Sequence, residues 1–261
     1  MTLAAPLAGP SARFMARNVA TLEQGAQWSP LSLGASLLAW WTAERADLMT
    51  LSGAQVSSWR DVVAGYDAAQ ATGTRRPTYS ATSFGGGPGL TFDGVDDYLF
   101  ATQPGVFPVD ASPCEMWVLM QQDSLAEATA TTLILQYGGT DGFLRRRSLE
   151  RAVISGVSRA QGTVGDGSTR AFPTVSSVDL SSRHVLRLEV AATESRLSVD
   201  NSAAATVAFV PATAAMRVAI GATLIGTSPL NGKIAEVLVT GALTDAQAAA
   251  LWSYLMPKRR V

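Results

Sequence analysis

From Leu37 onward the chain consists of short hydrophobic runs separated by residues that favour turns. In Arg183–Val190, the side chains of Leu186, Leu188 and Val190 alternate with polar ones, which is the period of a half-buried strand. Leu37–Ala43 is hydrophobic on both faces, as expected for a strand in the centre of a core. Further strands are predicted at Val56–Trp59, Leu90–Phe92, Glu115–Met120, Thr132–Tyr137, Arg151–Val157, Phe172–Val178, Arg196–Asp200, Met216–Ile220 and Ile234–Val239. Many short strands between turns indicate an all-β fold, a two-sheet antiparallel jelly-roll sandwich.

One short helix is predicted at the C-terminal end. Thr244 and Gln247 have the spacing of a capping box, in which each side chain bonds the backbone near the other residue. Leu251, Trp252 and several alanines continue the helix, and Pro257 is expected to stop it. The basic residues 258–260 that follow are expected to form a solvated cationic end.

The first 36 residues show no sustained hydrophobic period and contain three prolines. Residues 1–36 are therefore predicted to be an N-terminal arm, and residues 37–261 the jelly-roll domain. The arm is expected either to be flexible or to anchor the domain to a larger body. Because the first residues lack a leading positive charge and a continuous apolar region, we expect no secretion signal and synthesis in the cytoplasm.

Composition excludes several classes of function. Charged residues make up 16% of the chain and the net charge is −1, so no basic surface for nucleic acid is indicated. No apolar run is long enough to span a bilayer, so membrane insertion is not expected. The single cysteine, Cys114, excludes an internal disulfide framework and a cysteine-rich zinc site, and its apolar surroundings predict a buried, inert thiol.

Three segments in a fixed order carry a resemblance to a known family. The first contains Leu38-Ala39-Trp40 and Val56-Ser57-Ser58-Trp59-Arg60-Asp61, and the second is Leu90–Leu99 with Phe92-Asp93-Gly94. The third runs from Asn231 through Glu236 to the C-terminal helix. Together they resemble the laminin-G-like branch of the concanavalin A-like lectin/glucanase superfamily. The resemblance marks Trp59, Asp61, Phe92, Asp93, Gly94 and Glu236 as a structural signature.

The resemblance implies a jelly roll whose loops or concave face bind sugars. Such modules are frequent in surface proteins of bacteria and in the spikes and fibres of bacteriophages and phage-like particles. We therefore expect a non-enzymatic carbohydrate-binding or structural protein on the surface of such a particle. Its expected partners are a cell-surface polysaccharide and, through the arm, other particle subunits, in a homo-oligomer or larger assembly. A purely subunit-binding assembly protein and a glycoside hydrolase are the alternatives.

Hydrolysis requires a pair of carboxyl groups, which related glucanases place on one strand as Glu-x-Asp-x-Glu. Apart from Glu127, which follows Asp123 by four positions, no glutamate of this chain has an acidic residue two or four positions away, and no Glu-x-Asp-x-Glu run is present, so an enzyme is not expected unless distant carboxylates meet. Glu236 is the best single candidate. By alternation it shares a face with Ile234 and Leu238, and it is expected either to be buried and paired with an arginine, Arg45 or Arg60, or to act as an acid of raised pKa.

Asp93, Asp96 and Asp97 are weak candidates for calcium ligands, and turn and cap roles are the alternative. No other cofactor is indicated. His184, the only histidine, has no nucleophile motif beside it and is expected to be structural.

The candidate carbohydrate-binding residues follow or flank a glycine-rich turn. They are Tyr137, Asp141, Arg145 and Arg147. Alternation places Arg145 and Arg147 on one face, where they could bind an anionic polysaccharide or a neighbouring subunit, with the Tyr137 ring for stacking. A solvated hairpin is the alternative.

Overall fold

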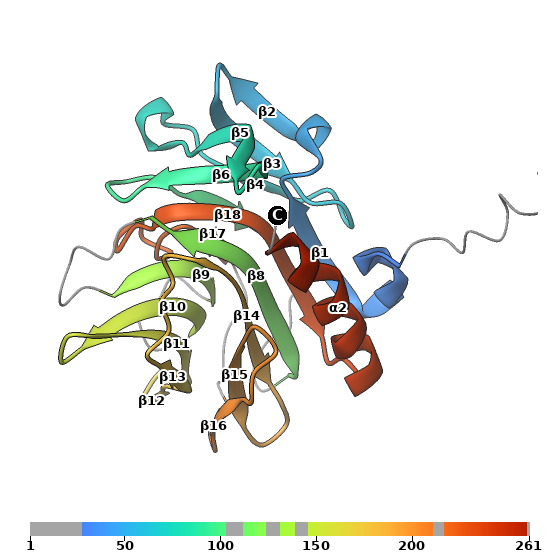
Figure 1. Cartoon of the computed structure of the whole chain (residues 1–261), viewed down its shortest axis with the longest axis vertical. Helices are drawn as coiled ribbons and strands as arrows, with labels where there is room; N and C mark the ends of the chain where they lie inside the picture. Colours follow the sequence, from blue (N-terminus) through green and yellow to red (C-terminus); the bar gives the residue numbers. More distant parts are fainter. Residues whose placement is uncertain (1–27, 103–111, 124–130, 139–145, 211–216, 260–261) are drawn as a thin grey trace, which may run out of the picture.

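The computed structural model describes residues 28–102, 112–123, 131–138, 146–210 and 217–259 (Figure 1). These residues form an antiparallel β-sandwich with one α-helix, α2 (Asp245–Lys258), and three 3-10 helices, η1 (Pro30–Ser36), η2 (Ala46–Leu48) and η3 (Gly73–Arg75). The all-β jelly-roll prediction is confirmed. None of the helices in the described part of the chain is long and apolar enough to cross a membrane.

The first sheet is built around β18. Its strands, in spatial order, are β16 (Ala205–Val207), β15 (Ser195–Val199), β14 (Arg183–Val190), β8 (Cys114–Gln122) and β18 (Asn231–Gly241), with β6 (Gly87–Asp93) and β1 (Leu37–Thr42) both on the far edge of β18. All of these pairings are antiparallel. Because β18 is long, it can pair with β8 along one edge and with two shorter strands along the other.

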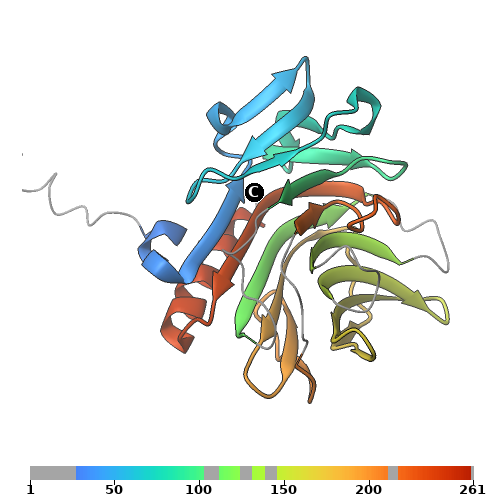
Figure 2. The ribbon, with the colours of Figure 1, turned by 180° about the vertical axis from the view of Figure 1, so that it is seen from behind.

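The second sheet runs in the order β4 (Asp67–Ala69), β7 (Leu99–Thr102), β17 (Arg217–Ile220), β9 (Thr132–Gly138), β10 (Arg146–Ile154) and β11 (Val157–Gly165), and then β12 (Arg170–Ala171) and β13 (Thr174–Ser176). Strands β5 (Thr78–Phe84), β3 (Gln55–Arg60) and β2 (Met49–Ser52) connect the two sheets at one side. At the other side β11 and β13 lie beside β15, so the strands nearly enclose the core (Figures 1 and 2).

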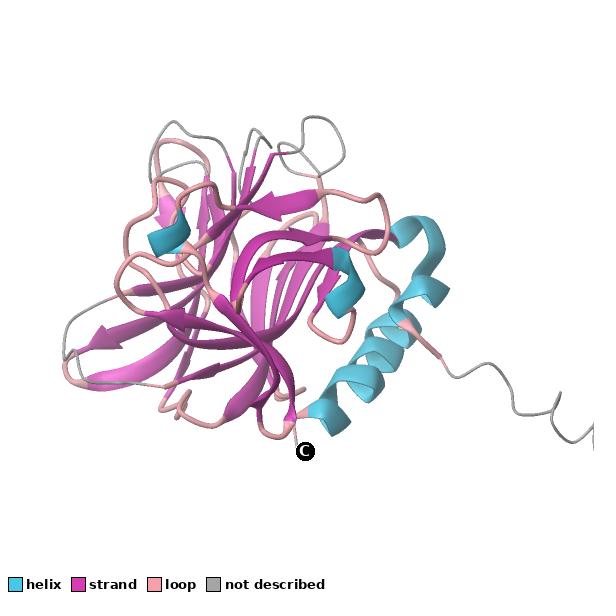
Figure 3. Ribbon diagram, turned by 90° about the horizontal axis from the view of Figure 1, so that it is seen from above, coloured by secondary structure: helices cyan, strands magenta, loops and turns pink. Residues whose placement is uncertain are grey.

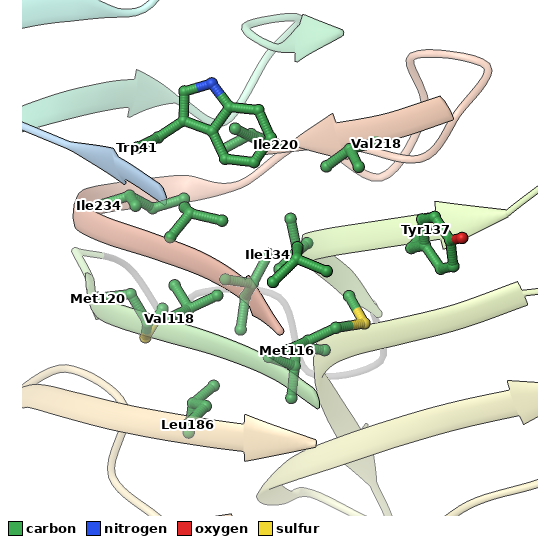
Figure 4. Close-up of a cluster of buried hydrophobic side chains, with 14 of the residues drawn as sticks. Trp41, Met116, Val118, Met120, Ile134, Tyr137, Leu186, Val218, Ile220 and Ile234 are labelled. Carbon is green, nitrogen blue, oxygen red and sulfur yellow. The ribbon is translucent and has the colours of Figure 1, made fainter. Parts of the chain in front are cut away.

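The main core lies between the two sheets. From the first sheet, Met116, Val118 and Leu186 point inward, and from the second sheet Val218 and Ile220 meet them (Figure 4). All five side chains are buried, and the alternation read from the sequence of β14 matches the inward residues. Burial of this apolar surface is the main force that holds the two sheets together.

A second apolar cluster lies on the outer face of the first sheet, where α2 covers it (Figure 3). Leu251 and Trp252 of the helix pack against Trp117 and Leu238, and the two indole rings lie 4.8 Å apart at 67°. The capping box at Thr244 is present as predicted. Pro257, however, does not end the helix: it lies in the last turn, where its missing N–H costs only the bond to the carbonyl of residue 253.

The predicted arm is shorter than residues 1–36. Pro30 and Leu33 of η1 are buried, Leu33 belongs to the cluster under α2, and the Trp28 ring lies 5.9 Å from that of Tyr254. Residues 28–36 are thus part of the folded body, because their apolar side chains complete the cover of the first sheet. An arm over residues 1–27 stays a prediction.

Two local predictions were wrong because single residues interrupt a strand pattern. Ser155 and Gly156 have positive φ values of 53° and 76° and form a turn, so the strand predicted at Arg151–Val157 is split between β10 and β11. In β18 the pairing with β8 shifts between Ile234 and Glu236. This bulge turns Ile234 toward the main core and Glu236 toward α2, so they do not share a face.

The signature residues hold strand ends and turns. The Trp59 indole is buried and donates to the carbonyl of Thr42 at 3.3 Å. The carboxylate of Asp61 accepts bonds from three backbone N–H groups, at distances of 2.5–3.1 Å, in the loop that follows β3. Phe92 is buried in the main core. At the next turn Gly94 has a φ of 78°, a conformation that glycine adopts without strain.

Candidate functional site

The outer face of the second sheet is polar. Paired residues of antiparallel strands point to the same face, and Gln136 of β9 pairs with Ser148 of β10, which pairs with Thr163 of β11. The next row along these strands contains Glu150 and Gln161. All five side chains are buried, although their neighbours along each strand point into the apolar core. Five buried polar side chains on three adjacent strands form an uncommon arrangement for a face that only supports packing.

Glu150 is the anionic centre of this face. Its carboxylate accepts a hydrogen bond from the Ser148 hydroxyl at 2.5 Å and forms an ion pair with Arg146 at 3.1 Å. Burial lowers the pKa of Arg146, while the charge of Glu150 raises it and that of Arg170 lowers it further. Arg146 and Arg170 therefore lie close enough for their charges to interact.

Thr163 carries a hydrogen-bonding group that the protein does not use. Its hydroxyl oxygen is buried, and it has no hydrogen-bond partner in the described protein. By contrast, Gln136 on the same face accepts a bond from the backbone N–H of Leu224 at 3.2 Å. A buried hydroxyl without a partner is costly and uncommon in native structures, but Thr163 is 0% exposed and so is closed to an external ligand.

Aromatic rings with an arginine above them flank the polar side chains. Phe172, just after β12, is 43% exposed, and the Arg170 guanidinium lies 5.8 Å from its ring centre. At the opposite edge the Arg217 guanidinium lies 5.2 Å from the ring centre of Phe100, which itself contacts Tyr98. An exposed aromatic face beside hydrogen-bonding groups suits a sugar ring, which has apolar C–H groups and polar hydroxyls.

The structure places two of the predicted binding residues elsewhere. Tyr137 and Arg147 pair across β9 and β10, on the inner face, and both are fully buried. The Arg147 guanidinium contacts the Cys114 thiol at 2.5 Å and lies 5.8 Å from the Tyr137 ring centre. Neither side chain is available for an external ligand in this structure, because the sheet register turns both inward. Asp141 and Arg145 lie outside the described residues.

Sequence reasoning missed Arg146, Arg170 and Phe172. The alternation that was used for Arg145 and Arg147 also assigns Arg146 to the opposite face, and that face is the outer one. The strand around Arg170 is only two residues long, so its pattern gave no signal.

The partner of Glu236 is not an arginine. Its carboxylate is 1% exposed and accepts bonds from Trp40 Nε1 at 2.6 Å and Lys258 Nζ at 2.5 Å. Burial raises the pKa of Glu236, while the charge and hydrogen bond of Lys258 lower it. The two arginines proposed as partners do not contact it: Arg45 pairs with Asp47, and Arg60 lies beside Gly65.

Glu44 is the second carboxylate near Glu236. The Lys258 ammonium also pairs with it, at 2.8 Å, so the two carboxylates are bridged by one cation. A cation between the carboxylates occupies the position that a glycosidic bond would need in a hydrolase. The geometry therefore favours a structural role for Glu236.

The basic end of α2 is not simply solvated, as the sequence predicted. Lys258 binds Glu236, and Arg259 pairs with Asp200, which follows β15. Asp200 also contacts His184 Nδ1 at 2.6 Å, and His184 Nε2 lies 2.7 Å from the carbonyl of Asp179. His184 thus has a structural position, between β14, the turn after β15 and the end of the helix.

Asp93, Asp96 and Asp97 bring carboxylate oxygens within 4.8 Å of one another. Asp93 accepts bonds from the N–H groups of Val95 and Asp96, and Asp97 accepts one from the N–H of Asp93. These bonds close the turn after β6. Burial raises the pKa of Asp97 to about 6, an effect that the bond from the Asp93 backbone opposes and the charges of Asp93 and Asp96 reinforce.

No family model matches the sequence, and no curated protein matches it. Solved structures resemble the fold. The binding domain of botulinum neurotoxin DC, in complex with rat synaptotagmin II, has a TM-score of 0.59 at 8% identity, over 84% of this chain and 52% of that one. Trypanosoma rangeli sialidase has a TM-score of 0.54 at 16% identity, over 84% of this chain and 32% of that one.

The enzymatically active domain of bacteriophage CBA120 tailspike protein 2 has a TM-score of 0.50 at 14% identity, over 69% of this chain and 29% of that one. The chain therefore spans about half the length of the neurotoxin domain and about a third of the other two structures. At identities this low, the likeness establishes a common β-sandwich fold.

Proposed function

We propose that this chain is a non-enzymatic carbohydrate-binding domain and that its ligand binds at the edge of the second sheet, around Arg170 and Phe172. The observation that carries the proposal is the Phe172 ring, 43% exposed, with the guanidinium of the exposed Arg170 5.8 Å from its centre. Hydrogen-bonding groups and aromatic faces are what a sugar requires of a protein surface.

We further propose that the domain belongs to a spike or fibre of a phage or phage-like particle and attaches it to glycan on a host surface. The resemblance of its signature segments to laminin-G-like modules supports this context, as does the similarity in fold to a phage tailspike domain. Residues 1–27 would then join the domain to other particle subunits.

A glycan array with the full chain tests the ligand. Wild-type protein should bind a defined set of glycans, and Phe172→Ala should weaken this binding about tenfold, as expected for loss of one aromatic contact. Leu51→Ala is a matched control, since Leu51 is a similarly exposed hydrophobic residue, 41% exposed, on the distant strand β2. Equal effects of the two substitutions would rule out the proposed site.

Two other results would overturn the wider proposal. Release of reducing ends from a bound polysaccharide would show that the protein is an enzyme. Absence of binding to every glycan, with particle assembly intact, would favour the alternative of a subunit-binding assembly protein. Attachment through the arm is tested by deleting residues 1–27: the domain should fold but not enter particles, and normal incorporation would disprove it.

A further inference from the structure

The outer side of α2 lacks the charged residues that a surface helix normally carries. Asp245 lies in the first turn and Lys258 in the last, and no residue between them is charged. One side of the helix packs on the first sheet (Figure 3), and Ala249, Ser253 and Pro257 are exposed on the other. A surface helix usually has a polar outer face, whereas a helix that is apolar all round is usually buried all round. The outer side of α2 is therefore suited to a further apolar contact.

A groove lies along this outer side. Its volume is about 580 Å³. The Trp28 and Tyr254 rings lie 5.9 Å apart at its edge, and both are only partly buried. Small side chains on the helix allow another helix to approach closely. The groove is lined by Trp28, Ala250, Ser253, Tyr254, Pro257 and Lys258.

Residues 1–27 lie outside the described part of the chain, and they join it at this groove. Trp28, the first described residue, is one of the groove's walls. A segment a few residues before Trp28 is therefore held next to the groove by the chain itself. A short tether of this kind gives a local concentration on the order of millimolar, which favours the chain's own segment over a free partner.

The sequence before Trp28 contains a segment with an apolar side. Residues 11–24 include neither proline nor glycine, and Ser11 is a favourable N-cap for a helix that begins at residue 12. Met15, Val19 and Leu22 have the i, i+4, i+7 spacing that puts side chains on one side of a helix. A helix over residues 12–23 would thus match the apolar groove with an apolar stripe of its own.

The lengths are compatible with such a contact. A helix over residues 12–23 would be about 18 Å long, and α2 is about 21 Å long. Packed helices lie about 8–10 Å apart between axes, and the four-residue connection 24–27 can span about 13 Å. Gly25 in this connection would let the chain reverse its direction.

From these observations we infer that residues 12–23 bind as an amphipathic helix in the groove on α2 of the same chain. Met15, Val19 and Leu22 face the groove, and the Trp28 and Tyr254 rings close its edge. The inference goes beyond the proposed function, which concerns the edge of the second sheet. It is compatible with attachment through the arm, because residues 1–11 precede the docked segment.

Cysteine cross-linking in the full chain tests the contact. Ser253→Cys is combined with Met15→Cys or Val19→Cys on the apolar side of the segment, and with Thr21→Cys, on its opposite side, as a matched control. Cys114 is buried and should not compete. A disulfide requires Cα atoms within about 7 Å. On mild oxidation at least one of the first two pairs should form a disulfide within a single chain, and the Thr21 pair should not.

Tryptic cleavage after Arg13 and Arg17 gives a second measure. Binding in the groove should protect both sites. Ala250→Glu puts a carboxylate into the groove and should speed cleavage about tenfold or more, because cleavage follows the population of the released segment. Ala204→Glu is the matched control, since Ala204 is exposed in the connection between β15 and β16, and it should leave the rate unchanged. Circular dichroism would establish that both variants are folded.

Three results would overturn the inference. Disulfides between two chains rather than within one would show that the groove takes the segment of a second copy. Equal cross-linking of the Thr21 and Val19 pairs would show that no side of the segment is preferred. Tryptic cleavage of the wild-type protein as fast as that of the Ala250→Glu variant would show that the segment is not protected. None of these results bears on glycan binding at Phe172, so the proposed function is tested separately.

Discussion

Lys258 Nζ lies 2.5 Å from Glu236 Oε1, so the last turn of α2 is fixed to a carboxylate that is buried beneath it. The ammonium also reaches Glu44 and the Tyr254 hydroxyl. The helix covers the apolar outer face of the first sheet, and this contact fixes its C-terminal end at the point where the bulge of β18 turns Glu236 outward.

Lys258→Met should therefore destabilise the protein by about 3 kcal/mol, because it leaves a buried carboxylate without its cation. Urea unfolding measures this change. The double variant Glu236→Gln/Lys258→Met should lose less stability than Lys258→Met alone, since it leaves no buried charge. Arg45→Ala removes an exposed ion pair and should have no measurable effect. Equal losses in the single and the double variant would contradict the role given to Glu236.

His184 should titrate above the usual histidine range. Burial by itself lowers its pKa, but the hydrogen bonds to Asp200 and to the backbone of Asp179, with the charge of Asp200, outweigh burial and the opposing charge of Arg259. Because the chain has a single histidine, its ring signals in an NMR titration are unambiguous. Asp200→Asn should lower the observed pKa. An unchanged value would show that the 2.6 Å contact does not act in solution.

The raised pKa of His184 also makes the stability of the protein depend on pH. The folded-state pKa lies above the unfolded value of about 6.5, so the contribution of the pair is complete below that pH. It is then lost as the pH rises through the folded-state pKa. Asp200→Asn should accordingly destabilise the protein more at pH 5.5 than at pH 8.5.

Asp97 should give the stability of the protein a second pH dependence, at lower pH than that of His184. Its pKa of about 6 exceeds the value of about 3.9 for an unfolded aspartate, so the native state favours the protonated form. Stability from this group is complete below pH 4 and is lost as the pH rises through 6. Asp97→Asn keeps an acceptor for the Asp93 N–H and should stabilise the protein by about 2 kcal/mol at pH 8 relative to pH 4. A pH-independent difference in urea midpoints would refute this.

Alanine substitutions at Gly94 and Gly53 would distinguish the cost of a positive φ from the cost of a steric clash. Both have positive φ, 78° and 63°, so alanine should cost about 1 kcal/mol at either position. At Gly94 the new Cβ would also lie 2.6 Å from Asn231 Cβ, whereas at Gly53 it would meet nothing within 4 Å. Gly94→Ala should thus lose roughly 1–3 kcal/mol more than Gly53→Ala in urea unfolding. Similar losses would show that the turn moves to admit the methyl group.

Sequence reasoning predicted the structure correctly where the signal lies within a few neighbouring residues. Period-two alternation gave β14 and its inward residues, and the Thr244 capping box gave the start of α2, because both signals are local. It failed where the outcome depends on register. The bulge after Ile234 changes the face on which Glu236 lies, and no residue pattern near Ile234 predicts this shift in register.

The candidate site was less predictable than the fold for the same reason. Arg170 begins a strand of only two residues, which Phe172 follows, and only the pairing of this strand with β11 places both residues at the edge of the second sheet. Tyr137 and Arg147 were chosen because they flank a glycine-rich turn, but the ladder between β9 and β10 turns both inward. Alternation in the sequence shows which residues of a strand share a face. Whether that face is the inner or the outer one depends on how the strand pairs in the sheet.

The described body begins at Trp28, against Tyr254, and ends at Arg259, so the chain enters and leaves on the side of α2. Strand β12, which Phe172 follows, lies in the second sheet, away from α2 (Figure 1). Attachment to a solid support through either terminus should therefore orient every copy in the same way, with the exposed Phe172 ring turned away from the support. Under the proposed function, a dense layer of such copies would bind one long polysaccharide at many points, and weak single contacts would add up to firm adhesion.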